Sequence, residues 1–182
     1  MNRTALLAVV WTAVIAAGVV QANTACAPRE SGLTLADGFC ATVFADDTGP
    51  VRNLTVSPEG DVFAALRDER SGVLALRDTD GDGRADVRER FGAGPAHGIA
   101  FHGGHLYVAM PDRVVRWPWK PGQLVPSGDA EVVVGDFPPQ RAHAQKGLAI
   151  AADGTLFVGV GAPSNACQEE SRTAGSPGLE IP

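Results

Sequence analysis

The chain has no excess of basic residues and no long run of positive charge. It carries 15 Lys and Arg against 21 Asp and Glu, for a formal net charge of -6. Binding of nucleic acid calls for a basic face that matches the phosphate backbone, so nucleic acid is set aside as a partner. The hydrophobic fraction of 45% is normal for one globular domain and argues against disorder over the whole chain.

Long apolar runs are lacking except at the N-terminus, where Arg3 precedes a run from Ala5 to Val20. The residues Val20 to Ala22 then form a small-residue cleavage pattern, so residues 1–22 are predicted to be a secretory signal peptide. A membrane anchor is the alternative, but the run is short for a span of about 20 residues. We expect a periplasmic or secreted protein with no stable membrane span after cleavage.

Cysteine is scarce, with three in the chain. In an oxidising compartment Cys26 and Cys40, which are 14 residues apart, are able to pair and pin the N-terminal segment to the first strand. Cys167 is then left over, which indicates either a reactive thiol or a partner outside this chain.

Helical periodicity is also lacking after residue 22, and a strand-turn-strand block instead occurs three times. The aromatic residues Phe63, Tyr107 and Phe157 mark the blocks at intervals of 44 and 50 residues. Such intervals are typical of four-stranded propeller blades, whereas a β-sandwich, the alternative, would not repeat at this period. The sequence therefore predicts an all-β fold, a partial β-propeller.

Residues 23–164 have room for about three blades, and propellers typically need 4 to 8 to close. Residues 165–182 read as a Gly/Pro-rich tail without a closing strand. We expect the chain to be the N-terminal part of a longer propeller.

One acidic loop, from Asp78 to Glu89, has the spacing of a twelve-position calcium loop. Gly83 at position 6 permits the sharp turn that aims alternate oxygens at one ion. The expected ligands are five carboxylates and one backbone carbonyl, from Asp78, Asp80, Asp82, Arg84, Asp86 and Glu89. The flanks look like strands, so calcium would brace a connection between strands. A solvated turn without an ion is the alternative.

Several segments resemble the soluble pyrroloquinoline-quinone (PQQ)-dependent sugar dehydrogenases, the glucose/sorbosone dehydrogenase group. They are the opening strand 38–45, the blade entry 96–102, the segment 143–148, the hairpin 151–161 and the segment 164–167. The resemblance runs from about Gly32 to Gly178. It implies a six-bladed propeller that oxidises an aldose or sorbosone-like sugar with PQQ.

The same resemblance implies roles for four residues. His143 stands where the family has its general base, which accepts the proton of the sugar C1 hydroxyl, and imidazole titrates in the range that this step needs. Lys146 stands where a basic residue meets the cofactor. His97 and Arg52, at the starts of two earlier strands, would face the same channel and also contact the cofactor.

The family builds its quinone and calcium sites partly from later blades, which this sequence does not contain, so we expect the chain to be inactive alone. The electron acceptor is not implied. Two other functions stay open at this point. One is a non-catalytic, calcium-braced propeller module that binds a partner. The other is a metal-dependent propeller hydrolase, which the few carboxylates near the expected channel disfavour.

Overall fold

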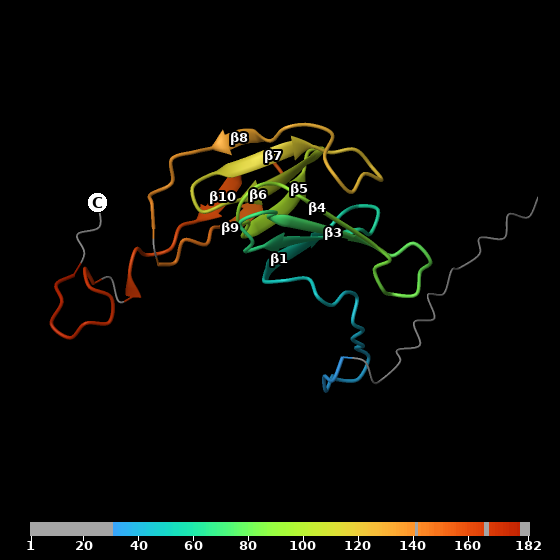
Figure 1. Cartoon of the computed structure of the whole chain (residues 1–182), viewed down its shortest axis with the longest axis horizontal. Coiled ribbons are helices and arrows are strands. Elements are labelled where there is room, and N and C mark those ends of the chain that lie inside the picture. The colour runs from blue at the N-terminus through green and yellow to red at the C-terminus, as the bar shows by residue number, and fades with distance from the viewer. Residues whose placement is uncertain (1–30, 141, 166–167, 179–182) are drawn as a thin grey trace, which may run out of the picture. The chain divides into compact units, whose positions relative to one another are not determined.

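The computed structural model describes residues 31–140, 142–165 and 168–178, and within these ranges it contains β-strands and no α-helix (Figure 1). No helix in this part of the chain is long and apolar enough to cross a membrane. The predicted signal peptide at 1–22 lies outside the described residues. The chain divides into two compact units, residues 1–41 and 42–182.

The first unit is described from Ser31 onward, and it contains a turn at Asp37 and Gly38 where the Phe39 N–H donates to the Ala36 carbonyl at 3.2 Å. Cys40 is disulfide-bonded. The other two cysteines of the chain, Cys26 and Cys167, lie outside the described residues, so the pairing with Cys26 stays a prediction.

The second unit contains three antiparallel sheets in which each strand pairs with the next one along the chain. The first sheet consists of β1 (Val51–Val56), β2 (Val62–Leu66), β3 (Val73–Arg77) and β4 (Val87–Phe91). The second consists of β5 (Gly98–His102), β6 (His105–Ala109), β7 (Val114–Pro118) and β8 (Glu131–Val134). The third has two strands, β9 (Gly147–Ile150) and β10 (Leu156–Gly159).

These sheets confirm the predicted partial β-propeller. Phe63, Tyr107 and Phe157 lie on β2, β6 and β10, the second strand of each sheet, as the repeat predicts. Two blades have four strands, and the third has two among the described residues. The turns before the second strands contain glycine at positive φ, including Gly60 at 98° and Gly154 at 89°. Glycine adopts this conformation without a steric penalty from Cβ.

The core lies between the first and second sheets and is rich in aromatic rings. Phe63 of β2 meets Trp119 edge to face, with ring centroids 5.1 Å apart, and Phe91 of β4 meets Trp117 of β7 at 5.7 Å. Aromatic pairs in this geometry stabilise a core beyond the area they bury. Trp117 and Trp119 thus fill the gap between the first two blades.

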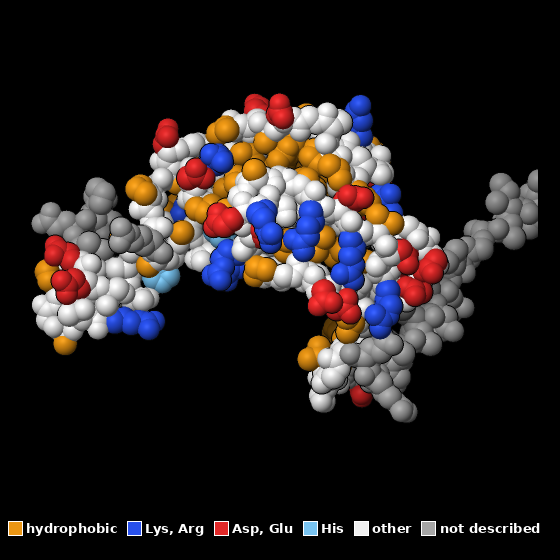
Figure 2. Space-filling view, in the orientation of Figure 1, with side chains coloured by type: hydrophobic (Ala, Val, Ile, Leu, Met, Phe, Trp, Pro, Cys, Tyr) orange, Lys and Arg blue, Asp and Glu red, His pale blue; other side chains and the backbone are white. Residues whose placement is uncertain are grey.

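The first strands of the three sheets lie side by side, β5 between β1 and β9. Gly98, the first residue of β5, has no space for a side chain, because a Cβ there would lie 2.5 Å from the Leu148 Cβ. Hydrophobic side chains at the surface of this unit include Leu54 of β1, 61% exposed, and Phe157 of β10, 58% exposed. Figure 2 also shows hydrophobic side chains on the side of β7 and β8.

Candidate functional site

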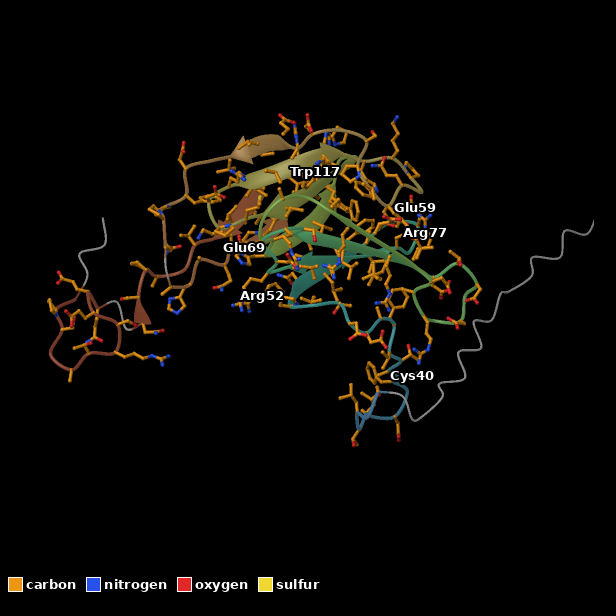
Figure 3. The ribbon with its side chains drawn as sticks, viewed as in Figure 1. Cys40, Arg52, Glu59, Glu69, Arg77 and Trp117 are labelled. Atoms are coloured by element: carbon orange, nitrogen blue, oxygen red, sulfur yellow. The ribbon has the colours of Figure 1, made fainter. Side chains whose placement is uncertain are left out.

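A cluster of basic residues lies where the three inner strands begin. Arg52 is on β1, His97 immediately precedes β5, and Lys146 immediately precedes β9. The positive charges of Arg52 and Lys146 both act on the His97 imidazole, so the structure brings together the three residues expected to contact a cofactor. Figure 3 shows Arg52 at this end of the first sheet.

His97 is 5% exposed, and its backbone N–H donates to the Ala109 carbonyl at 2.8 Å. Burial lowers the pKa of His97, and the nearby charges of Arg52, Lys146 and Arg67 lower it further. Neutral imidazole is therefore favoured at pH 7. Its Nδ1 atom is buried without a hydrogen-bond partner in the described part of the protein, and such an atom is a position where a ligand would gain a hydrogen bond.

Lys146 is fully buried although it carries an ammonium group. Its Nζ donates to the Gln140 side-chain oxygen at 2.8 Å and to the Ala144 carbonyl at 3.0 Å, and it lies 5.9 Å from the centre of the Phe137 ring. Burial lowers the pKa of Lys146. No carboxylate pairs with Lys146 among residues 31–140, 142–165 and 168–178. Within these residues, the hydrogen bonds of its ammonium group go to two uncharged oxygens, those of the Gln140 side chain and the Ala144 carbonyl.

Arg67 extends the cluster and was not identified from the sequence. It follows β2, its backbone N–H donates to the Pro50 carbonyl at 3.0 Å, and its charge also reaches His97. Neither Arg52 nor Arg67 takes part in an ion pair within the described ranges. Three cations without carboxylate partners make this end of the inner strands a site suited to an anion.

His143 lies in the loop before β9 and is exposed, with a left-handed backbone at φ 52°. Its Nδ1 is 2.9 Å from the Ala162 carbonyl oxygen. Because a carbonyl only accepts, Nδ1 carries the proton and donates, which leaves Nε2 as the acceptor nitrogen. In this tautomer Nε2 is the acceptor nitrogen of the ring.

Gly161 and Gln140 connect His143 to Lys146. A Cβ at Gly161 would lie 2.7 Å from the His143 Cβ, so the absence of a side chain there lets the two loops pack together. The Gln140 amide donates to the Gly161 carbonyl and accepts from Lys146. Gln140 thereby holds both the buried cation and the loop beside His143, a role that no sequence motif indicates.

The acidic loop gathers three of its expected carboxylates. Oxygen atoms of Asp78, Asp80 and Asp86 lie within 4.8 Å of one another, and no such group in the described residues includes Asp82 or Glu89. Glu89 lies inside β4, opposite Ala75, so the strand carries it away from the loop. The structure also places Arg84 in the loop, where its N–H donates to Asp82 at 2.8 Å.

The Asp78 carboxylate holds the loop in shape. One oxygen accepts from the Gly81 N–H at 2.7 Å and the other from the Gly83 N–H at 2.8 Å. These hydrogen bonds lower the pKa of Asp78, and the bond from the Gly83 N–H has the largest effect. The pKa of Asp86 is lowered by the Thr79 backbone N–H and hydroxyl. Both carboxylates are charged at neutral pH, as a calcium ligand must be.

A family model described as TrAA12-like matches residues 33–177 of the chain. Among curated proteins, none matches significantly. Among solved structures, the chain is similar to the holo form of the pyranose dehydrogenase PQQ domain from Coprinopsis cinerea, with a TM-score of 0.60 and 18% identity. The similarity covers 71% of this chain and 32% of that one.

A second similar structure is the calcium structure of the Carbohydrate-Active Enzymes Family AA12 protein from Trichoderma reesei, with a TM-score of 0.54 and 19% identity. The similarity covers 63% of this chain and 30% of the Trichoderma reesei chain. The chain thus spans about a third of the length of these structures. At these identities the likeness supports the propeller fold.

Proposed function

The chain belongs to the TrAA12-like family, within the PQQ-dependent sugar dehydrogenase-like proteins, and from this membership we propose that it forms the cofactor-facing part of an exported sugar oxidoreductase. The observation that carries the proposal is the cluster of Arg52, Arg67, His97 and Lys146 at the start of the inner strands. The structures similar to it span about three times its length, so turnover is a property proposed for the whole propeller.

The residues of this cluster fit PQQ in charge and in hydrogen bonding. PQQ is a planar ortho-quinone with several carboxylates, and the cluster offers cations that no described carboxylate neutralises. The unpartnered Nδ1 of His97 would meet a quinone or carboxylate oxygen as a donor. Arg52 and Arg67 would pair with carboxylates, and Lys146 would meet an oxygen near the ring. When bound, PQQ would supply the two-electron redox chemistry.

His143 is proposed to move the proton of the reaction. Its Nε2 would accept the proton of the sugar hydroxyl as the hydride leaves the same carbon, and the Ala162 carbonyl would stabilise the resulting imidazolium through Nδ1–H. The exposure of His143 allows a sugar to reach Nε2. Gln140 and Gly161 would fix the loop so that the nitrogen keeps its position.

Calcium is proposed to bind the acidic loop as a structural brace between β3 and β4. Asp78, Asp80 and Asp86 supply the oxygens that the structure brings together. Export to the periplasm or to the medium is proposed from residues 1–22 and gains support from the disulfide at Cys40, because disulfides persist in oxidising compartments. The preferred sugar is proposed to be an aldose or a sorbosone-like sugar.

Titration of the full chain with PQQ tests the proposal. Binding is followed by quenching of protein fluorescence, first in the wild type and then in Lys146→Met. We expect the Lys146→Met change to weaken binding about tenfold or more, since a charge-assisted bond is worth roughly 1.5–3 kcal/mol. Lys120→Met is the matched control, because Lys120 is exposed and follows β7. Equal affinities in the two variants would refute the cofactor site.

The same titration separates the redox proposal from the alternative of a non-catalytic binding module, which has no need of PQQ. In a form of the chain that is extended to a closed propeller, His143→Ala should abolish sugar-dependent dye reduction, and added imidazole should restore part of it. Loss of dye reduction without rescue at any pH would show that His143 serves only the structure of its loop.

A further inference from the structure

A cavity of about 330 Å³ lies between the first two sheets, away from the cation cluster. Its walls come from the β1–β2 turn, the end of β5 with the turn that follows, and the residues after β7. Arg52 lies near the start of β1 and Glu59 in the turn after it, and Figure 3 shows them at opposite ends of the first sheet. The cavity is therefore a second, separate feature.

Two aromatic rings form the apolar wall of this cavity. Phe101 of β5 and Trp119 lie with their centroids 5.4 Å apart at an angle of 66°, and both are only partly buried. Both rings pack edge to face on Phe63, with centroids 5.2 and 5.1 Å away. Since Phe63 is fully buried, the wall is fixed by the core and has little freedom to move.

Polar groups accompany the two rings. Trp119, a residue of the wall, has a buried Nε1–H without an acceptor, one of two such side-chain atoms in the described residues. Glu59 is exposed and offers a carboxylate at the rim. His105 donates through Nδ1 to the Gly103 carbonyl at 2.9 Å, and its Nε2 is left as an acceptor. A ligand that both donates and accepts would match these groups.

We propose that this cavity binds a pyranose ring, as a monosaccharide or the end residue of a longer saccharide. A sugar has an apolar C–H face that stacks on aromatic rings, and each of its hydroxyls both donates and accepts. An apolar ligand would leave the Glu59 carboxylate and the His105 Nε2 without a donor, and the Glu59 carboxylate repels an anion. The volume is at the small end of the range for small-molecule sites, which suits one sugar ring.

The site requires neither PQQ nor His143, so it goes beyond the proposed redox function. A sugar held here would be bound at the far end of the blades from the cation cluster. It would therefore attach the protein to a saccharide and would not be the molecule that is oxidised.

The test uses the full chain labelled with ¹⁵N and methyl β-glucopyranoside, which lacks the free C1 hydroxyl of an aldose. The indole N–H signal of Trp119 should shift in a saturable way at sugar concentrations up to about 100 mM. The indole of Trp117 should not shift, because Trp117 is 7% exposed and lies outside the cavity wall. Cyclohexylmethanol serves as a ring of similar size with fewer hydroxyls.

Glu59→Gln should weaken sugar binding about tenfold, since a hydrogen bond to a charged group is lost. Glu69→Gln is the matched control, because Glu69 is also exposed and lies toward the Arg52 end of the first sheet (Figure 3). Both variants retain the aromatic core, so neither depends on refolding around a missing ring.

Three outcomes would overturn the proposal. They are the absence of a saturable Trp119 shift, equal affinity for cyclohexylmethanol and the glucoside, and equal weakening by Glu59→Gln and Glu69→Gln. Titration of the same variants with PQQ distinguishes failure of the saccharide site from failure of the cofactor site. A chain that binds the glucoside and not PQQ supports this site while refuting the cofactor site, and the reverse result refutes this site alone.

Discussion

The ion pair between Asp61 and Arg77 helps to hold the first two sheets together, and removing it tests this role. Asp61 has a side chain that is 6% exposed, and it accepts from Arg77 Nε at 2.7 Å and Nη2 at 2.6 Å. The same Nη2 donates to the Gly122 carbonyl at 2.9 Å, beyond β7 in the second sheet. Figure 3 shows Arg77 beside Glu59, at the end of the first sheet that lies away from Arg52.

Arg77→Met keeps much of the aliphatic volume and removes the charge, which leaves the Asp61 carboxylate buried without its partner. Breaking a buried pair in this way costs about 3–5 kcal/mol. Because the Arg77 side chain is 30% exposed, water reaches part of the pair, and we expect the lower end, about 3 kcal/mol. In a chain of this size such a loss lowers Tm by roughly 6–12 °C.

Arg88→Met is the matched control. Arg88 of β4 pairs with Asp46 at 3.1 Å, but these side chains are 39% and 70% exposed. Exposed pairs contribute about 0–1 kcal/mol, so this variant should unfold close to the wild type. Urea unfolding followed by tryptophan fluorescence measures both. Equal, small losses in Arg77→Met and Arg88→Met would refute the view that burial of Asp61 makes its partner essential.

Three further predictions concern the candidate sites. Gly161→Ala should disturb the His143 tautomer, seen as a changed ¹⁵N shift of Nδ1, and cost about 1–3 kcal/mol through overpacking, while Gly159→Ala, whose nearest contact would be 3.8 Å away, should do neither. Because the pKa of His97 is lowered on folding, the unfolded state takes up its proton first. Stability should therefore fall as pH drops below about 6.5 and stay level above it, a trend that His97→Gln should remove from pH-dependent urea unfolding. Calorimetric titration should find calcium binding weakened about tenfold by Asp78→Asn and little by Asp82→Asn, and equal effects would contradict the three-carboxylate group.

Much of the fold could be predicted from the sequence because the strands are short, mostly apolar and end at turn residues, and because they recur at a regular interval. The expected strand flanks of the acidic loop coincide with β3 and β4. The repeat that predicted the blades is visible as equivalent positions on β2, β6 and β10. These features depend on residues that are close together in the chain, namely apolar strand segments and the turn residues between them, and such patterns can be read directly from a sequence.

The candidate site was predictable only in part. His97 and Arg52 were predicted because each stands at the start of an inner strand, and Lys146 because the resemblance places a basic residue at its position. Arg67 and Gln140 were missed, because their roles depend on contacts between segments far apart in the chain. The calcium pattern indicated six ligands, but twelve-position spacing assumes a helix after the loop, and here β4 extends Glu89 away from the other carboxylates.

The lack of space at Gly98 also limits how the second and third blades can be placed against each other. A Cβ there would overlap Leu148 of β9, so the second and third blades approach each other most closely at their inner edges. Sheets that touch at one edge and separate toward the other are wedges, and the angle of the wedge determines how many fit around the axis. A larger residue at position 98 would open the inner edge, reduce the angle between neighbouring blades, and favour a wider circle that the same number of blades could not complete.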